Sequence, residues 1–194
     1  MIKMPGPDSL AKLAVRGTDD RLWYSRARQE LQKVADHFNS PYATVAGLAA
    51  VLSPRVSVRR SMRLLGQYLR GQQWPADVYA AKRDAVSAWA SQGRLSGQKV
   101  RAFYDNLMGH EHSVVLDTWM AKAMLTPRRP WPSTGGPLVD KATIRIQTVA
   151  RMLGWTPAQV QAAIWSATYR AHRGGASPPA ITAQDALEQV HAKS

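Results

Sequence analysis

Apolar residues recur at every third or fourth position along almost the whole chain, whereas strictly alternating polar and apolar residues occur only in short stretches. A period near 3.6 places apolar side chains on one face of an α-helix, and half-buried strands would need a period of 2. The sequence therefore predicts an all-α fold. Its 194 residues suffice for one domain, or for one domain divided into two helical lobes.

Prolines, glycines and N-capping residues divide this pattern into successive helices. The helix predicted over 42–52 is very apolar, and small residues such as Gly47 would let neighbouring helices approach it closely. In the helix predicted over 57–70, the arginines fall largely away from the apolar stripe, so that face should meet solvent or phosphate. The other predicted helices cover 19–38, 78–92, 98–108, a segment after Asp117, 138–153, 156–173 and a short stretch from 182.

The chain is strongly basic, with 26 lysines and arginines against 13 acidic residues and a formal net charge of +13. Such an excess implies an anionic partner, and double-stranded DNA is the first choice. Binding that neutralises phosphates would weaken steeply as salt rises. The alternative is a solvated basic surface without a partner.

Several classes of protein are excluded or disfavoured. The chain has no cysteine, which excludes disulfides, thiolate-bound zinc and cysteine-ligated iron-sulfur clusters. His110, Glu111 and His112 lie on a predicted turn with no third histidine nearby, so we interpret them as a surface loop and expect no metal. No phosphate-binding P-loop, GxGxxG or GxSxG motif occurs. Without a long apolar run, we expect a cytoplasmic, monomeric protein that does not contact a membrane.

The most informative stretch runs from Gly93 to Met124. A glycine-containing turn leads into a helix that begins near Lys99, and Asp117 follows 18 residues later at a predicted N-cap. On a helical wheel Lys99 lies at the edge of an apolar stripe, close to Asn106, so its stem can be buried while its amine reaches a cleft. Partial burial lowers the pKa of an amine and makes it a nucleophile. The alternatives are a surface lysine and an aspartate that only caps a helix.

This stretch resembles the helix-hairpin-helix DNA glycosylases of the endonuclease III type. In that family the hairpin presents backbone amides to a DNA phosphate, a lysine is the nucleophile, and an aspartate completes the site. Gly97 matches the second hairpin glycine, Lys99 the nucleophile, and Asp117 with Thr118 the aspartate-threonine pair. Residues 41–62 and 162–172 also look like helices of that family, so the resemblance covers about two thirds of the chain.

The resemblance implies two helical lobes, one of residues 41–125 and the other of 1–40 and 126–194, with the hairpin at the cleft between them. It implies no cofactor, apart from a cation that hairpin carbonyls near Gly93–Gly97 would be able to hold. A flipped base would meet a pocket of Trp119, Tyr104 and Trp165, each of which has a plain core role as its alternative. The DNA contacts that we expect are Gly97, Gln98, Arg101, Ser53, Arg55, Arg59, Arg60, Arg128 and Arg129.

Three departures from the family pattern affect the functional reading. Leu95 stands at the position of the first hairpin glycine, Trp119 stands where the family has a histidine, and the cluster cysteines are absent.

The leading interpretation is a DNA N-glycosylase with lyase activity at abasic sites, in a bacterial or phage-infected cell. One alternative is a phage thymine-hypermodification enzyme, similar to the thymine pyrophosphorylases, that replaces a pyrophosphate on 5-hydroxymethyluracil with an amine. Another is a DNA-binding relative without catalysis.

Overall fold

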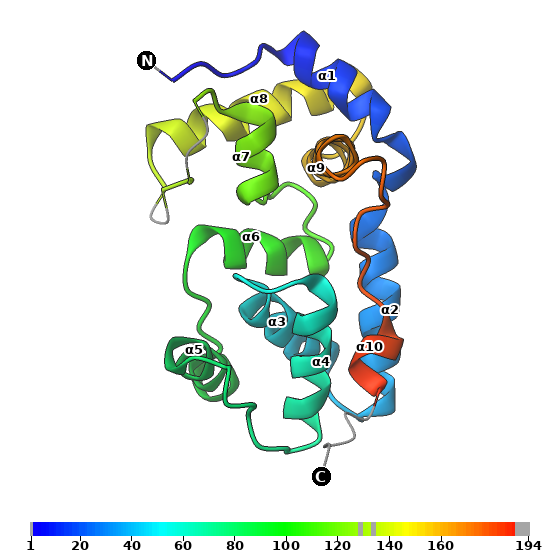
Figure 1. Cartoon of the computed structure of the whole chain (residues 1–194), viewed down its shortest axis with the longest axis vertical. Coiled ribbons are helices and arrows are strands. Elements are labelled where there is room, and N and C mark those ends of the chain that lie inside the picture. Colours follow the sequence, from blue (N-terminus) through cyan, green and yellow to red (C-terminus); the bar gives the residue numbers. More distant parts are fainter. Residues whose placement is uncertain (1, 128–129, 133–134, 189–194) are drawn as a thin grey trace. The chain divides into compact units, whose positions relative to one another are not determined.

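A computed structural model describes residues 2–127, 130–132 and 135–188 (Figure 1). Regular structure in these residues is helical, apart from an isolated antiparallel bridge between Lys3 and Thr126, and the all-α prediction is therefore confirmed. No described helix is long and apolar enough to cross a membrane. The elements are α1 Pro7–Arg16, η1 Thr18–Asp20, α2 Trp23–His37, α3 Tyr42–Leu52, α4 Val58–Leu69, α5 Ala80–Gln92, α6 Gln98–Leu107, α7 Thr118–Met124, α8 Pro137–Leu153, α9 Pro157–His172 and α10 Ala183–Leu187.

The chain forms two compact units. Unit 1 comprises Met1–Ser25 and Gly97–Pro178, and unit 2 comprises Arg26–Ser96 and Pro179–Ser194. These boundaries differ from the lobes expected from the sequence, because residues 97–125 group with 1–25 and 126–178, while 26–40 and 179–194 belong to the other unit. The difference has a physical reason: α7 packs against α9, a pairing between distant segments that no local pattern reveals.

Unit 1 is built on α9, which α1, α7 and α8 contact (Figure 1). Gly17 ends α1 close to α9, since a Cβ added there would lie 2.0 Å from the carbonyl oxygen of Ala163. The sequence analysis did not predict α1, and it started the first helix at residue 19, where the structure has only the short 3-10 turn η1. The available signal was Pro7 in the first turn with Gly17 at the end. The buried core is Leu10, Ala14, Val114, Leu116, Met120, Met124, Val139, Ala142, Ile146, Val149, Ala150, Val160, Ala163 and Ile164.

In unit 2 the apolar helix α3 contacts both α4 and α5. Gly47 allows the close approach of α5, because a Cβ at this position would lie 2.0 Å from the ring of Trp89. The Trp89 indole also donates a hydrogen bond of 3.2 Å to the carbonyl of Thr44. The predicted role of the small residues in this helix is therefore confirmed.

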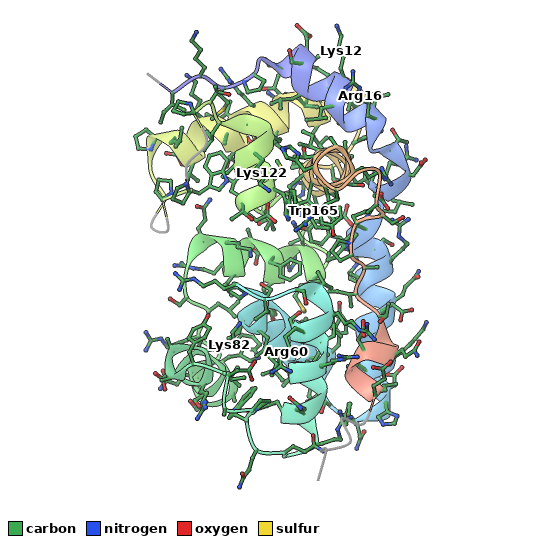
Figure 2. The ribbon with its side chains drawn as sticks, viewed as in Figure 1. Lys12, Arg16, Arg60, Lys82, Lys122 and Trp165 are labelled. Carbon is green, nitrogen blue, oxygen red and sulfur yellow. The ribbon has the colours of Figure 1, made fainter. Side chains whose placement is uncertain are left out.

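Lys82 is a buried charge of unit 2, labelled in Figure 2. Its ammonium donates to the carbonyls of Leu52 and Pro54, at 2.7 and 2.8 Å. These acceptors lie at and just beyond the end of α3, where helix carbonyls lack partners and carry partial negative charge. The lysine thus closes α3 and holds the start of the loop after it.

The arginine face of α4 packs against α10 in unit 2, where the sequence analysis placed solvent or phosphate (Figure 1). Arg63 forms an ion pair of 3.0 Å with Glu188, and Arg70 donates to the carbonyls of Ala186 and Glu188. Gly66 lets the two helices touch, because a Cβ there would lie 1.8 Å from the Ala186 carbonyl oxygen. The expectation was therefore wrong for Arg63 and Arg70, which residues at the far end of the sequence engage, whereas the Arg59 side chain is 63% exposed to solvent.

Replacing Gly17 by alanine should destabilise unit 1 by about 2 kcal/mol, since the new methyl group would force α1 away from the backbone of α9. Gly6→Ala is the matched control, because no atom lies within 4 Å of a Cβ there. Urea unfolding followed by circular dichroism measures both variants. Equal stability of the two variants would contradict the close contact.

Candidate active site

Asp117 caps α7 as predicted, and its carboxylate is held by three N–H donors. Oδ1 accepts from the backbone amides of Trp119 and Met120, at 3.0 and 2.9 Å. Oδ2 accepts from the indole of Trp165 on α9 at 3.0 Å. The capping bonds satisfy amides that a helix N-terminus leaves unpaired. The third bond comes from a helix 48 residues away in sequence and fixes the orientation of the carboxylate.

Lys99 lies in the first turn of α6, directly after Gly97, whose φ of +83° is a conformation that favours glycine. The Lys99 side chain is half-buried, and Val100 and Asn106 of the same helix are buried. Within the described residues, its ammonium makes no direct ion pair with a carboxylate. The amine is therefore partly removed from water without being locked in a salt bridge.

Burial acts on the two charged groups in opposite directions. It lowers the pKa of Lys99, while the charge of Asp117 acts on that lysine in the opposite, smaller sense. It raises the pKa of Asp117, against the effects of the Met120 amide, the Lys99 charge, the Trp165 indole and the Trp119 amide. Both shifts favour the neutral forms, so moving a proton from the lysine to the aspartate costs less here than in water. An amine and a carboxylate matched in this way suit nucleophilic chemistry.

A polar group that the sequence analysis missed lies next to this pair. Tyr24 is buried, its hydroxyl donates 2.7 Å to Oε1 of Gln161, and it also hydrogen-bonds the side chain of Asn106. Burial raises the pKa of Tyr24, and the Asp117 charge adds to that effect, so the tyrosine stays neutral. Tyr24 and Gln161 are 137 residues apart, so no local signal was available.

Trp131 supplies a further contact to the aspartate. Its indole donates 2.9 Å to the backbone carbonyl of Asp117. This bond attaches the loop before α8 to the start of α7. Trp131 is therefore tied to the candidate active residue.

A chain of aromatic rings includes Trp165, the indole partner of Asp117. Trp165 contacts the ring of Trp23 at 6.0 Å and stacks on Tyr169 at 5.9 Å, and Tyr169 contacts Trp119 at 4.8 Å. Trp119 and Trp165 are half-buried, and each donates a hydrogen bond to the Asp117 carboxylate, Trp119 through its backbone amide and Trp165 through its indole. Tyr104 falls on a different side of α6 from Lys99, since five residues correspond to about 140° on a helix.

Gln98 and Arg101 also belong to α6, but they line a groove that Lys99 does not line. They line a polar surface groove of about 450 Å³ together with Asp105, Ser113 and other residues of unit 1. Ser113 donates a hydrogen bond of 2.9 Å to the Asp105 carboxylate inside this groove.

The turn at 110–112 has a structural role, because Glu111 accepts a 2.8 Å hydrogen bond from Thr156 at the start of α9. The described residues contain no cluster of three or more potential metal ligands.

The remaining predicted DNA contacts divide into three cases. Ser53 and Arg55 lie in the loop after α3, where Ser53 bonds the carbonyl of Ala50, and Arg55 is exposed with a φ of +61°. Arg59 and Arg60 are engaged within unit 2, by Asp185 at 3.0 Å and Asp77 at 2.8 Å respectively. Arg128 and Arg129 lie outside the described residues.

Comparison with known proteins places the chain in one family. Neither a curated protein nor a solved structure matches it. The family model described as "Family of unknown function (DUF7178)" matches residues 14–173. That range contains Lys99, Asp117 and every partner of their carboxylate and amine named above. Since the match covers most of the sequence, the chain belongs to the DUF7178 family of unknown function.

Proposed function

We propose that the protein is a DNA N-glycosylase with lyase activity at abasic sites, in which Lys99 is the nucleophile and Asp117 its proton acceptor. The observation that carries the proposal is the half-buried Lys99 amine, coupled to an Asp117 carboxylate that three N–H donors hold in place. The glycine turn before Lys99 and the net charge of +13 are in keeping with a DNA substrate.

The proposed reaction begins with transfer of a proton from the Lys99 ammonium to Asp117. The neutral amine then adds to the sugar C1′, and the bond between C1′ and the base breaks, with its electron pair leaving on the base. The amine nitrogen passes its second proton to the ring oxygen O4′ as the bond between C1′ and O4′ breaks, which leaves a protonated imine between Nζ and C1′. Loss of a proton from C2′ then expels the 3′-phosphate and nicks the strand. Asp117 passes the proton it received from Lys99 to the departing base, and its regenerated carboxylate then faces the positive charge of the imine and accepts the C2′ proton.

A second candidate function is the thymine-hypermodification reaction. The specific observation in its favour is Trp119, which stands where the glycosylases have a histidine and carries a lysine and an arginine over its ring. Such a pocket wall suits a base with an anionic substituent. Analysis of the reacted DNA separates the two candidates, since a glycosylase releases a free base and a hypermodification enzyme retains it.

Replacing Lys99 by alanine should abolish the covalent adduct that borohydride traps on a duplex with an abasic site. Borohydride reduces an imine to a stable amine, so the trapped band reports the bond to Nζ directly. Lys12→Ala, which removes an exposed lysine from α1 of the same unit, is the matched control and should trap normally. Normal trapping by the Lys99 variant would overturn the proposed nucleophile.

Asp117→Asn should keep the helix cap, because asparagine caps as well as aspartate, yet lower the rate of product formation by about a hundredfold. It should also lower the pKa of Lys99 further, since the Asp117 charge raises it. The reactive amine is the neutral form, so the rate rises with pH through that pKa, and the inflection should move to lower pH. Single-turnover rates across pH measure both effects. An unmoved inflection would mean that Asp117 is only a cap.

Binding to duplex DNA should weaken by about a thousandfold between 50 and 200 mM salt, as expected for roughly six neutralised phosphates. Arg101→Gln should lower the slope of log K against log salt by about 1. Arg151→Gln on α8, also an exposed arginine of unit 1, is the control and should leave the slope unchanged. Fluorescence anisotropy measures all three proteins, and a salt-independent affinity would contradict a phosphate-tracking surface.

A further inference from the structure

Two cations of unit 1 lie over a single aromatic ring. The Lys122 ammonium lies 3.8 Å from the centre of the Trp119 ring, and the Arg173 guanidinium lies 5.7 Å from it. Lys122 belongs to α7, and Arg173 follows the last residue of α9. A second ring, that of His172, contacts Trp119 with 6.1 Å between the ring centres.

These two cations are not neutralised in the described part of the chain, where no carboxylate forms an ion pair with either. Neighbouring arginines of unit 1 are used internally: Arg170 pairs with Asp20, and Arg145 donates to the carbonyls of Met4 and Pro5. The face of an aromatic ring attracts one cation by about 1 kcal/mol, and two cations at one ring repel each other. Within the described residues, no carboxylate therefore balances the positive charges of Lys122 and Arg173 at the Trp119 ring.

The cations have a fixed position relative to the candidate active site. The backbone amide of Trp119 donates to Oδ1 of Asp117, and the Trp165 indole donates to Oδ2. Tyr169 contacts the rings of both tryptophans. Figure 2 shows Lys122 and Trp165 in this part of unit 1. A substrate group bound by Lys122 and Arg173 would therefore lie at the ring of Trp119, the residue whose backbone amide donates to Asp117.

We propose that Trp119, Lys122 and Arg173 form a subsite that binds a phosphoryl group of the substrate. An ammonium and a guanidinium are the donors that phosphate oxygens accept most strongly, and the indole ring restricts where both cations lie. The proposal rests on the proposed function for its DNA substrate. The phosphoryl group belongs either to the DNA backbone or to a substituent on the base.

The first test uses inorganic pyrophosphate alone, at constant ionic strength. Its binding should shift the indole resonance of Trp119, which Trp119→Phe identifies by removing it. Lys122→Gln and Arg173→Gln should each weaken binding by about tenfold or more, the usual loss for one charge-assisted hydrogen bond. Lys12→Gln and Arg16→Gln are matched controls, because both residues project from α1 and are exposed (Figure 2).

The second test identifies the source of the phosphoryl group. If it is a backbone phosphate, a single neutral methylphosphonate at one position of the duplex should weaken binding to the parent protein but not to Lys122→Gln. If it lies on the base, a duplex with phosphorylated 5-hydroxymethyluracil should bind the parent protein about tenfold more tightly than a thymine duplex, and Lys122→Gln should lose that preference. Either result supports the subsite.

The subsite is overturned if Lys122→Gln and Arg173→Gln match their controls with pyrophosphate and with both duplexes. Folding is checked by circular dichroism, and the conservative Lys122→Arg should restore binding if charge is what matters. Borohydride trapping through Lys99 is measured on the same variants. Trapping without a phosphoryl effect removes this subsite and leaves the glycosylase in place, whereas pyrophosphate binding without trapping removes the glycosylase and leaves the subsite.

Discussion

The candidate site depends on the solvation of one carboxylate. A carboxylate withdrawn from water loses several kcal/mol of hydration free energy, and hydrogen bonds from the protein must replace it. Asp117 receives two such bonds from the start of α7 and one from α9, and its own carbonyl accepts the Trp131 indole. The same group therefore begins a helix, links it to a second helix and fastens a loop.

That arrangement also determines how Lys99 behaves. The three donors favour an ionised Asp117, and its negative charge partly offsets the effect of burial on the lysine. If the aspartate were free to rotate toward the amine, a tight salt bridge would form and the lysine would stay protonated. Held by the Trp165 indole, the carboxylate influences the amine without neutralising it.

The sequence allowed prediction of those parts of the site that depend on neighbours along the chain. Two turns of helix relate Lys99 to Asn106, and an N-cap relates Asp117 to Trp119, so both positions followed from local rules. Local rules do not predict which helices pack together, and for this reason the predicted boundaries of the two units were misplaced.

Tyr24 illustrates the limit, because its hydroxyl meets Gln161 across 137 residues and neither residue carries a motif. The arginines of α4 illustrate the same limit for electrostatics. Their spacing correctly predicted one basic face, but a count of charges does not say which of them have partners. Arg59 and Arg63 have theirs in Asp185 and Glu188, more than a hundred residues later.

The division of the chain has a consequence for its synthesis. The polypeptide passes between the units three times, after Ser25, after Ser96 and after Pro178. Helices α3, α4 and α5 therefore leave the ribosome early, while α10, which neutralises the α4 arginines, is made after α9. At typical elongation rates the delay between α4 and α10 is roughly 10 s. For that time Arg59 and Arg63 of a nascent unit 2 lack their partners Asp185 and Glu188, and the unit completes its fold only after all of unit 1 has been translated.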